Sequence, residues 1–265
     1  MITMMGRTHA LTGWCAGLAV APAAGVGTVH QAVIFAATTA GFALLPDLDH
    51  PGASASRLFG WLTGALSWVL RRISAAVYAL TKGPRDEKVT GTHRHLSHTL
   101  LFAVGLGAAT SAGCAAGGPW AVLGVLLLGL LLAVGALGDW LLLAYGGAAI
   151  WWYFTAPDDR VAQLADISGW LGVAVAVGCF VHCLGDSLTE SGCPFLFPLP
   201  IAGETWYEIR PPKPLRLHTG KKVETRLVFP VFVLVGILLV PGVWNWAVTT
   251  GERLFTPPAS QTATQ

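Results

Sequence analysis

Residues 100–137 read LLFAVGLGAATSAGCAAGGPWAVLGVLLLGLLLAVGAL, a run without a single Asp, Glu, Lys or Arg. A helix needs about 20 apolar residues to cross a bilayer, and the run holds two stretches of nearly that length, Leu100–Ala116 and Trp120–Leu137. The connection between them, Gly117–Pro119, contains two residue types that interrupt helices. We therefore expect two adjacent transmembrane helices here.

The composition of the whole chain indicates the same class of protein. Of the 265 residues, 54% are hydrophobic and only 11% are charged, against roughly 25% charged in soluble domains. A large soluble core would raise the apolar fraction but would not remove the charged surface. The sequence predicts an all-α, polytopic membrane protein, with residues 1–250 as one integral membrane helical domain and residues 251–265 as a polar tail. The net charge of +2 gives no reason to expect a nucleic-acid partner.

Further apolar stretches extend the predicted helical bundle on both sides of this run. Three more are long enough to cross a bilayer and two are shorter, which gives about seven spans. The segment Arg57–Leu80 has Arg71 and Arg72 in its middle, and we expect an interfacial amphipathic hairpin or helix pair there. The additional spans are Leu11–Val29, Ile167–Leu184 and Leu227–Ala247, with Ala32–Leu45 and Trp140–Phe154 as the shorter pair.

Positive residues predict which side of the membrane each loop occupies. Lys and Arg concentrate in two loops, 82–94 and 210–226, whereas the other connections near 25–31 and 117–119 have none. Cytoplasmic loops carry the excess of Lys and Arg, so both basic loops should be cytoplasmic. We expect the N-terminus to be retained as a first span and to start on that side. Counting spans then places Asp139 there too, together with the helix ends that carry His182 and Asp186.

Histidines and aspartates gather at these same helix ends. His9 precedes the first span, PDLDHP at 46–51 ends the second, HRHLSHT at 93–99 opens the third, and His182 and Asp186 close the sixth. The last two are one helical turn apart, so they lie on one face. Imidazole and carboxylate together suit zinc, manganese or iron, and more than four such ligands suggest two or more ions. The sequence predicts a metal site at the cytoplasmic helix ends.

Simpler interpretations of each segment remain open. His182 by itself is compatible with a hydrogen-bonded core histidine, although ionisable residues inside a membrane tend to be functional. Asp47 and Asp49 are compatible with helix caps. The histidines of 93–98, beside basic residues, are compatible with a patch that binds lipid headgroups.

The order and spacing of these blocks resemble a known family. HALTG at 9–13, LLPDLDHP at 44–51, HRHLSHT at 93–99 and HCLGDSLTESG at 182–192 are similar to motifs of YdjM-like proteins. These are described as predicted membrane-bound metal-dependent hydrolases, with motifs distantly similar to those of zinc-dependent phospholipase C and fungal zinc nucleases. The resemblance covers roughly residues 7–200.

The resemblance implies a set of metal ligands and a divalent metal, zinc or else manganese, with two or more ions. Asp49 and His50 are further candidates, either as ligands or as groups that orient ligands. The implied ligands are His9, Asp47, His93, His98, His182 and Asp186.

The resemblance also implies hydrolysis of a phosphoester. Divalent ions lower the pKa of a bound water to about 7, and Asp49 or Asp139 is expected to act as general base. Arg94 is expected to hold a phosphate oxygen. A site at the inner-membrane surface favours a phospholipid or a lipid-linked phosphate as substrate. Asp139 is absent from the motifs and rests on the topology alone. Metal binding for transport, sensing or structural partner binding, without hydrolysis, is the alternative.

Overall fold

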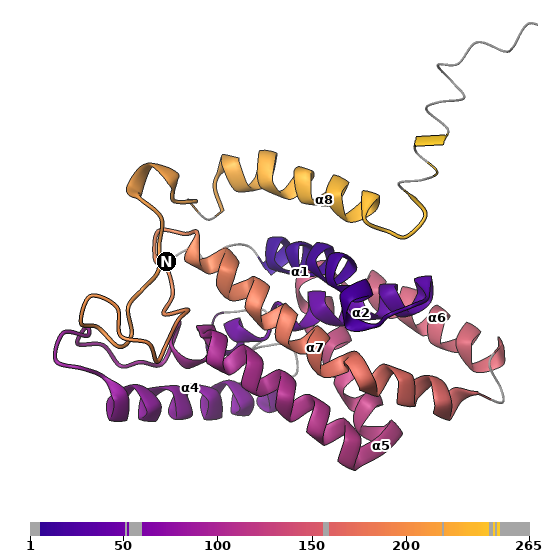
Figure 1. The fold of residues 1–265 in the computed structure, drawn as a ribbon, viewed down its shortest axis with the longest axis horizontal. Helices are drawn as coiled ribbons and strands as arrows, with labels where there is room; N and C mark the ends of the chain where they lie inside the picture. The colour runs from indigo at the N-terminus through magenta and orange to yellow at the C-terminus, as the bar shows by residue number, and fades with distance from the viewer. Residues whose placement is uncertain are drawn as a thin grey trace, which may run out of the picture.

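The computed structural model describes residues 6–50, 52, 60–155, 159–218, 220–243, 246 and 248–249. Its elements are helices, and these described residues form isolated β-bridges but no strand (Figure 1). The predicted all-α class is confirmed. The predicted polar tail, 251–265, lies outside the described residues.

Four helices form the centre of the bundle. They are α1 (Gly6–Val20), α2 (Val29–Phe42), α5 (Leu100–Leu137) and α7 (Arg160–Ser187). Helix α7 contacts the other three (Figure 1). Two helices lie at the periphery, where α6 (Trp140–Thr155) contacts α5 and α8 (Phe229–Leu238) contacts α1. The predicted site histidines and aspartates at the ends of α1, α2 and α7 are therefore positioned by direct contacts among these helices.

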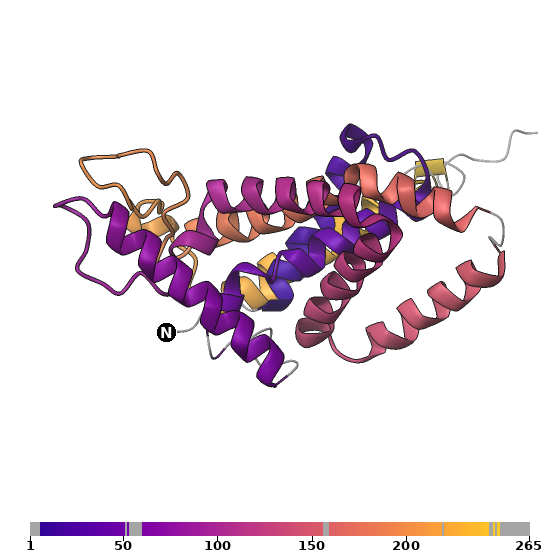
Figure 2. The ribbon, with the colours of Figure 1, turned by 90° about the horizontal axis from the view of Figure 1, so that it is seen from below.

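Helix α5 is sharply bent at the predicted break. Gly118 has φ 61° and ψ −149°, a conformation open to glycine, and Pro119 follows it. Figure 2 shows the chain changing direction there. The far end of α5 returns to the start of α1, because Arg7 Nε donates to the carbonyl of Ala136 at 3.4 Å. The two apolar stretches of the sequence are thus two arms of one bent element.

The predicted number of spans is not supported. Three segments are long and apolar enough to cross a membrane, by length and composition: Val29–Asp49, Leu100–Leu137 and Arg160–Ser187. Helix α1 has only 15 residues, because it gives way at Ala21 to a short 3-10 turn that contains Pro22. Helices α6 and α8, with 16 and 10 residues, are also shorter than a usual span.

Glycines allow the central helices to approach closely. A Cβ at Gly17 would lie 2.5 Å from the Cα of Ala36, so α1 and α2 touch backbone to backbone. A Cβ at Gly41 would lie 2.1 Å from the carbonyl oxygen of Gly129, which joins α2 to α5. Small residues at helix interfaces are typical of packing in membranes, where dispersion replaces the hydrophobic effect between helices.

The 82–94 loop lies against the segment that leads into the second basic loop, at one end of the molecule. Arg85 donates to the carbonyl of Ala202 at 3.1 Å, and the backbone N–H of Trp206 donates to Asp86 at 3.0 Å. Helix α4 (Trp61–Thr81) runs beside them (Figures 1 and 2). The described part of the predicted interfacial segment is this single helix, and the rest of that segment, 57–59, lies outside the described residues.

Candidate metal centre

Four short pieces of chain meet at the end of the bundle that carries the basic loops. The 3-10 turn η2 (Pro46–Asp49) follows α2, and Pro46 occupies its first turn. A second turn, η3 (Leu96–His98), leads into α5. The last turns of α7 and the first turn of α1 complete the site. Because α1, α2 and α7 pack against one another, these remote segments lie in one layer.

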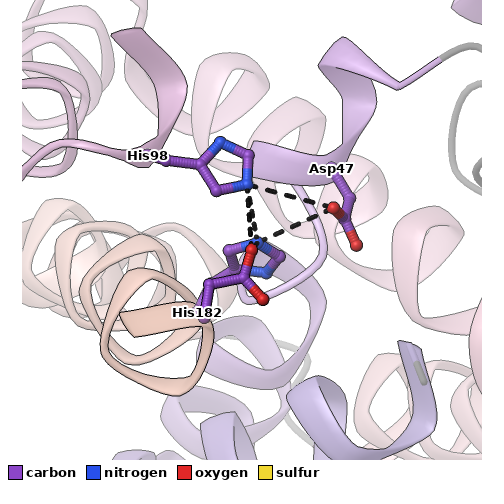
Figure 3. Close-up of side chains that lie close together, drawn as sticks. Asp47, His98 and His182 are labelled. Atoms are coloured by element: carbon purple, nitrogen blue, oxygen red, sulfur yellow. Dashed lines mark hydrogen bonds and ion pairs between the residues drawn. The ribbon is translucent and has the colours of Figure 1, made fainter. Parts of the chain in front are cut away.

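Asp47, His98, His182 and Asp186 place one ligand atom each within 4.8 Å of the others. The Nε2 atoms of His98 and His182 are 3.2 Å apart. Asp186 Oδ2 lies 3.4 Å from His98 Nε2 and 3.7 Å from His182 Nε2. All four side chains are buried, with Asp47 the most exposed at 11%. Figure 3 shows Asp47, His98 and His182 converging on one point.

Hydrogen bonds on the far side of each ring orient the two imidazoles. His182 Nδ1 donates to the carbonyl of Ala43 at 2.7 Å, which leaves the Nε2 lone pair directed into the site. His98 Nδ1 lies 3.0 Å from Ser97 Oγ and 3.4 Å from Asp49 Oδ2. Two nitrogens on one tetrahedral zinc ion lie roughly 3.3 Å apart, given Zn–N bonds of about 2.0–2.1 Å. The observed separation of the two Nε2 atoms fits a shared ion.

The carboxylates around His98 favour its protonated form. Burial alone lowers the pKa of His98, but the carboxylates of Asp49 and Asp186 outweigh burial and raise it to about 9. A protonated His98 then donates to His182 across 3.2 Å. A divalent cation would replace that proton, because metal ligands must be deprotonated.

Several buried ligand atoms have no hydrogen-bond partner. They are both carboxylate oxygens of Asp186, both ring nitrogens of His9, and Asp47 Oδ1. His9 Nε2 lies 3.4 Å from Asp186 Oδ1, an ion-pair distance without hydrogen-bond geometry, and its ring stacks on His182 at 4.0 Å. An unsatisfied buried polar atom costs about 1–3 kcal/mol. The concentration of such atoms at one point fits a bound cation, so these residues suit a divalent metal.

Asp49 lies on the Nδ1 side of the His98 ring, opposite the Nε2 atom that faces the other ligands. Its side chain is fully buried and accepts from His93 Nδ1 at 2.6 Å, Ser97 Oγ at 2.7 Å and the backbone N–H of Arg94 at 3.0 Å. These donors occupy most of its lone pairs. The geometry therefore favours Asp49 as a group that orients His98 and the 93–98 loop over its predicted role as general base.

Within the described part of the chain, Arg94 is the arginine that ion-pairs with the four-residue group. A terminal guanidinium nitrogen lies 3.0 Å from Asp186 Oδ2, and another donates to Thr189 Oγ1 at 3.5 Å. Its backbone has φ 56°, a left-handed conformation that is uncommon outside glycine. The bond from its N–H to Asp49 holds that conformation. Arg94 is buried against Asp186, with its Nε unpartnered.

The remaining predicted residues lie at increasing distance from the group. The His93 side chain is 25% exposed and its ring packs edge-on against His98 at 5.8 Å. His50 contacts His93 at 4.7 Å between ring centroids, and its Nδ1 accepts from Gly52 at 3.0 Å. Asp139 is exposed between α5 and α6 and is not brought into the group. Asp139 therefore lacks the structural support that the other residues have.

Three contributors were missed from the sequence. Ser97 joins Asp49 to His98, the carbonyl of Ala43 fixes His182, and Thr189 contacts Arg94. Ser97 and Thr189 stand inside the motif blocks at 93–99 and 182–192, so their positions beside the ligands were a usable signal. The role of Ala43 depends on its backbone and has no sequence signal.

Comparison with known proteins identifies the family and does not identify a reaction. Searches of the curated proteins and of the solved structures find no match. The family description that does match gives a membrane location and no chemistry. That match, described as YdjM inner membrane protein, spans residues 4–248, and the chain therefore belongs to the YdjM inner membrane protein family.

Proposed function

We propose that this protein is a multi-pass inner-membrane hydrolase that uses a divalent metal to cleave a phosphoester of a phospholipid or a lipid-linked phosphate. One observation carries the proposal: buried imidazoles and carboxylates converge, and several of their oxygens and nitrogens, among them Asp47 Oδ1 and the ring nitrogens of His9, have no hydrogen-bond partner. The number of ligand-type groups exceeds what one structural ion needs, because His9 contacts Asp186 beside the group of four. The motif blocks at 44–51, 93–99 and 182–192, which resemble those of predicted metal-dependent hydrolases, are the sequence support for hydrolysis, whereas the family match itself names no reaction.

The residues divide into holding and orienting roles in this proposal. Asp47, His98, His182 and Asp186 would hold the ion, with His9 completing a second set of ligands through Asp186. A bound divalent ion would supply a water of pKa about 7 and stabilise negative charge on phosphoryl oxygens. Asp49, with Ser97, orients His98. Arg94 pairs with Asp186 at 3.0 Å and holds that carboxylate in position.

We infer that the site faces the cytoplasm. The loops 82–94 and 194–226 carry most of the Lys and Arg residues and are joined by the Arg85–Ala202 and Asp86–Trp206 contacts. His93 and Arg94 belong to the first of these loops, so the site shares their side. Positive loops are typically cytoplasmic.

A structural ion without hydrolysis is the second candidate. It is favoured by burial, because the side chains of His98 and His182 are 0% exposed and that of Asp186 is 1% exposed. Closed four-ligand sites are typical of structural metals, whereas catalytic sites keep one position open. The two functions differ in turnover and share metal binding.

The test is phosphoester hydrolysis by the full chain in lipid nanodiscs, with zinc or manganese added. We expect release of a phosphorylated or dephosphorylated headgroup that depends on metal and is lost in His98→Ala. His218→Ala is the matched control, because His218 is exposed and pairs with Glu190 at 2.9 Å in a different loop. Bound metal with no turnover on any phosphoester lipid would refute hydrolysis and leave the structural ion.

A further inference from the structure

Helix α4 turns its polar face inward. Thr63, Ser67, Ser74 and Tyr78 are buried, at spacings of four or seven residues that place them on one face, and the helix contacts η2 and η3. Ser74 Oγ accepts from the N–H of Leu96, which ties this face to the loop that carries the site histidines. The buried face of α4 therefore lies beside the metal centre.

The outward face of α4 is apolar. Trp61 is 82% exposed and Leu80 is 85% exposed. Leu66, Trp68 and Ile73, between them, are about half exposed. An amphipathic helix in a soluble protein shows the reverse arrangement, with its apolar stripe toward the core. The outer face of α4 thus fits the apolar part of one membrane leaflet, and its inner face contacts η2 and η3.

Two donors on the inner face lack partners. Ser67 is 2% exposed and its Oγ has no hydrogen bond, and the same holds for the buried Nε of Arg71 one turn later. Buried polar groups in folded proteins are nearly always hydrogen-bonded. A buried hydroxyl and a buried guanidinium Nε on one face, both without a partner, favour an acceptor beside them, and the positive charge of the guanidinium favours an anionic one.

Neighbouring contacts direct this pair toward η2. Leu70, adjacent to Arg71, packs in the same apolar cluster as Leu45 and Leu48. Leu48 stands between Asp47 and Asp49 on η2. The pair Ser67 and Arg71 therefore shares the side of α4 that covers the turn carrying a metal ligand.

The net charge of the acidic residues around the metal centre favours a further positive group nearby. Asp47, Asp49 and Asp186 are opposed within the group by one arginine, Arg94. A single divalent ion would only neutralise the remainder, so an approaching anion would meet no net positive charge from the group. With one ion bound, Arg71 would add a positive charge from the adjacent helix.

We infer that Ser67 and Arg71 bind the anionic phosphoryl oxygens of a membrane lipid beside the metal centre, with its acyl chains along the apolar face of α4. The inference rests on the proposed function for the reaction that follows binding, but binding itself needs no turnover. Phosphoryl oxygens also occur on free phosphate, and the apolar outer face of α4 favours the lipid.

The adjacent arginines provide a matched test. Arg72 points outward and lies over the Trp68 ring at 5.2 Å, so it shares the charge of Arg71 but not its position. Binding of dioctanoyl phosphatidic acid and of inorganic phosphate to the detergent-purified, zinc-loaded full chain is measured by titration calorimetry. We expect Arg71→Gln to weaken lipid binding about tenfold or more and Arg72→Gln by less than about twofold. Equal effects of the two substitutions would overturn the inference.

Further variants and readouts separate binding from folding and from catalysis. Metal content and melting temperature are measured for each variant. If Arg71→Gln does not fold, Ser67→Ala is expected to weaken lipid binding about threefold or more with unchanged metal content, and unchanged binding there would overturn the inference. Inorganic phosphate binding as tightly as the lipid would refute the lipid as the ligand. Wild type that binds lipid through Arg71 without hydrolysing it would support this inference and refute the proposed function.

Discussion

Substitution of Asp49 by Asn tests how the site is organised, because Asp49 lies on the Nδ1 side of the His98 ring, away from the Nε2 atom that would bind the ion. Its Oδ1 accepts from His93, and its Oδ2 accepts from Ser97 and from the N–H of Arg94. An amide supplies one oxygen and one NH2, so whichever way it turns, a donor meets a donor. Loss of a carboxylate that orients a ligating histidine typically lowers metal affinity about 10–100-fold, or about 1.4–2.7 kcal/mol.

The assay is competition for zinc between the purified protein and a chelating dye, for wild type and Asp49→Asn. Asp86→Asn is the control for loss of a buried aspartate, because Asp86 accepts from the N–H groups of Gly83 and Trp206 in the loop region. We expect reduced affinity in the first variant alone. Unchanged zinc affinity in Asp49→Asn, with hydrolysis abolished, would refute the orienting role and restore the general base expected from the sequence.

Two further predictions concern protonation and packing. Asp49 and Asp186 raise the pKa of His98 to about 9 against the effect of burial, so a metal that binds His98 must displace a proton. Zinc affinity should therefore rise about tenfold per pH unit from pH 6 to 8. A zinc affinity that does not change with pH in a calorimetric titration would contradict this. Gly178→Ala should lower thermal stability by about 1–3 kcal/mol and weaken metal binding, because its Cβ would lie 2.6 Å from Thr39 O and would push α2 from α7. Gly169→Ala, in open space on the same helix, should leave both unchanged or raise stability slightly, and equal melting temperatures of the two variants would contradict the packing account.

The clustering of the motif residues followed from the sequence better than the number of spans did. The motif residues His98, His182 and Asp186 could be grouped because charge and hydropathy place their segments at helix ends, and helical spacing puts the last two on one face. The polar partners behind them were less visible. Ala43 acts through its carbonyl oxygen, whose position depends on how closely Gly178 lets α7 approach α2.

The errors in the span count have local physical causes. The first predicted span, Leu11–Val29, ran through Pro22 and Gly25, where the structure ends α1 and makes a turn with Gly25 at φ 81°. Apolar composition alone did not register that break. In 100–137, by contrast, the Gly–Pro connection indicated a break in the sequence, and the structure bends there at Gly118. Helix α4 was difficult to predict for another reason, because its polar residues face the protein interior and its apolar residues face outward.

The most direct test of the central claim is the metal content of the detergent-purified full chain, measured by elemental mass spectrometry. The account predicts at least one equivalent of zinc or manganese in wild type and loss of that metal in a His182→Ala/Asp186→Ala double variant that keeps its helical content. The same metal content in wild type and double variant, or no bound metal in wild type after reconstitution with either ion, would contradict the assignment of this group as a metal centre.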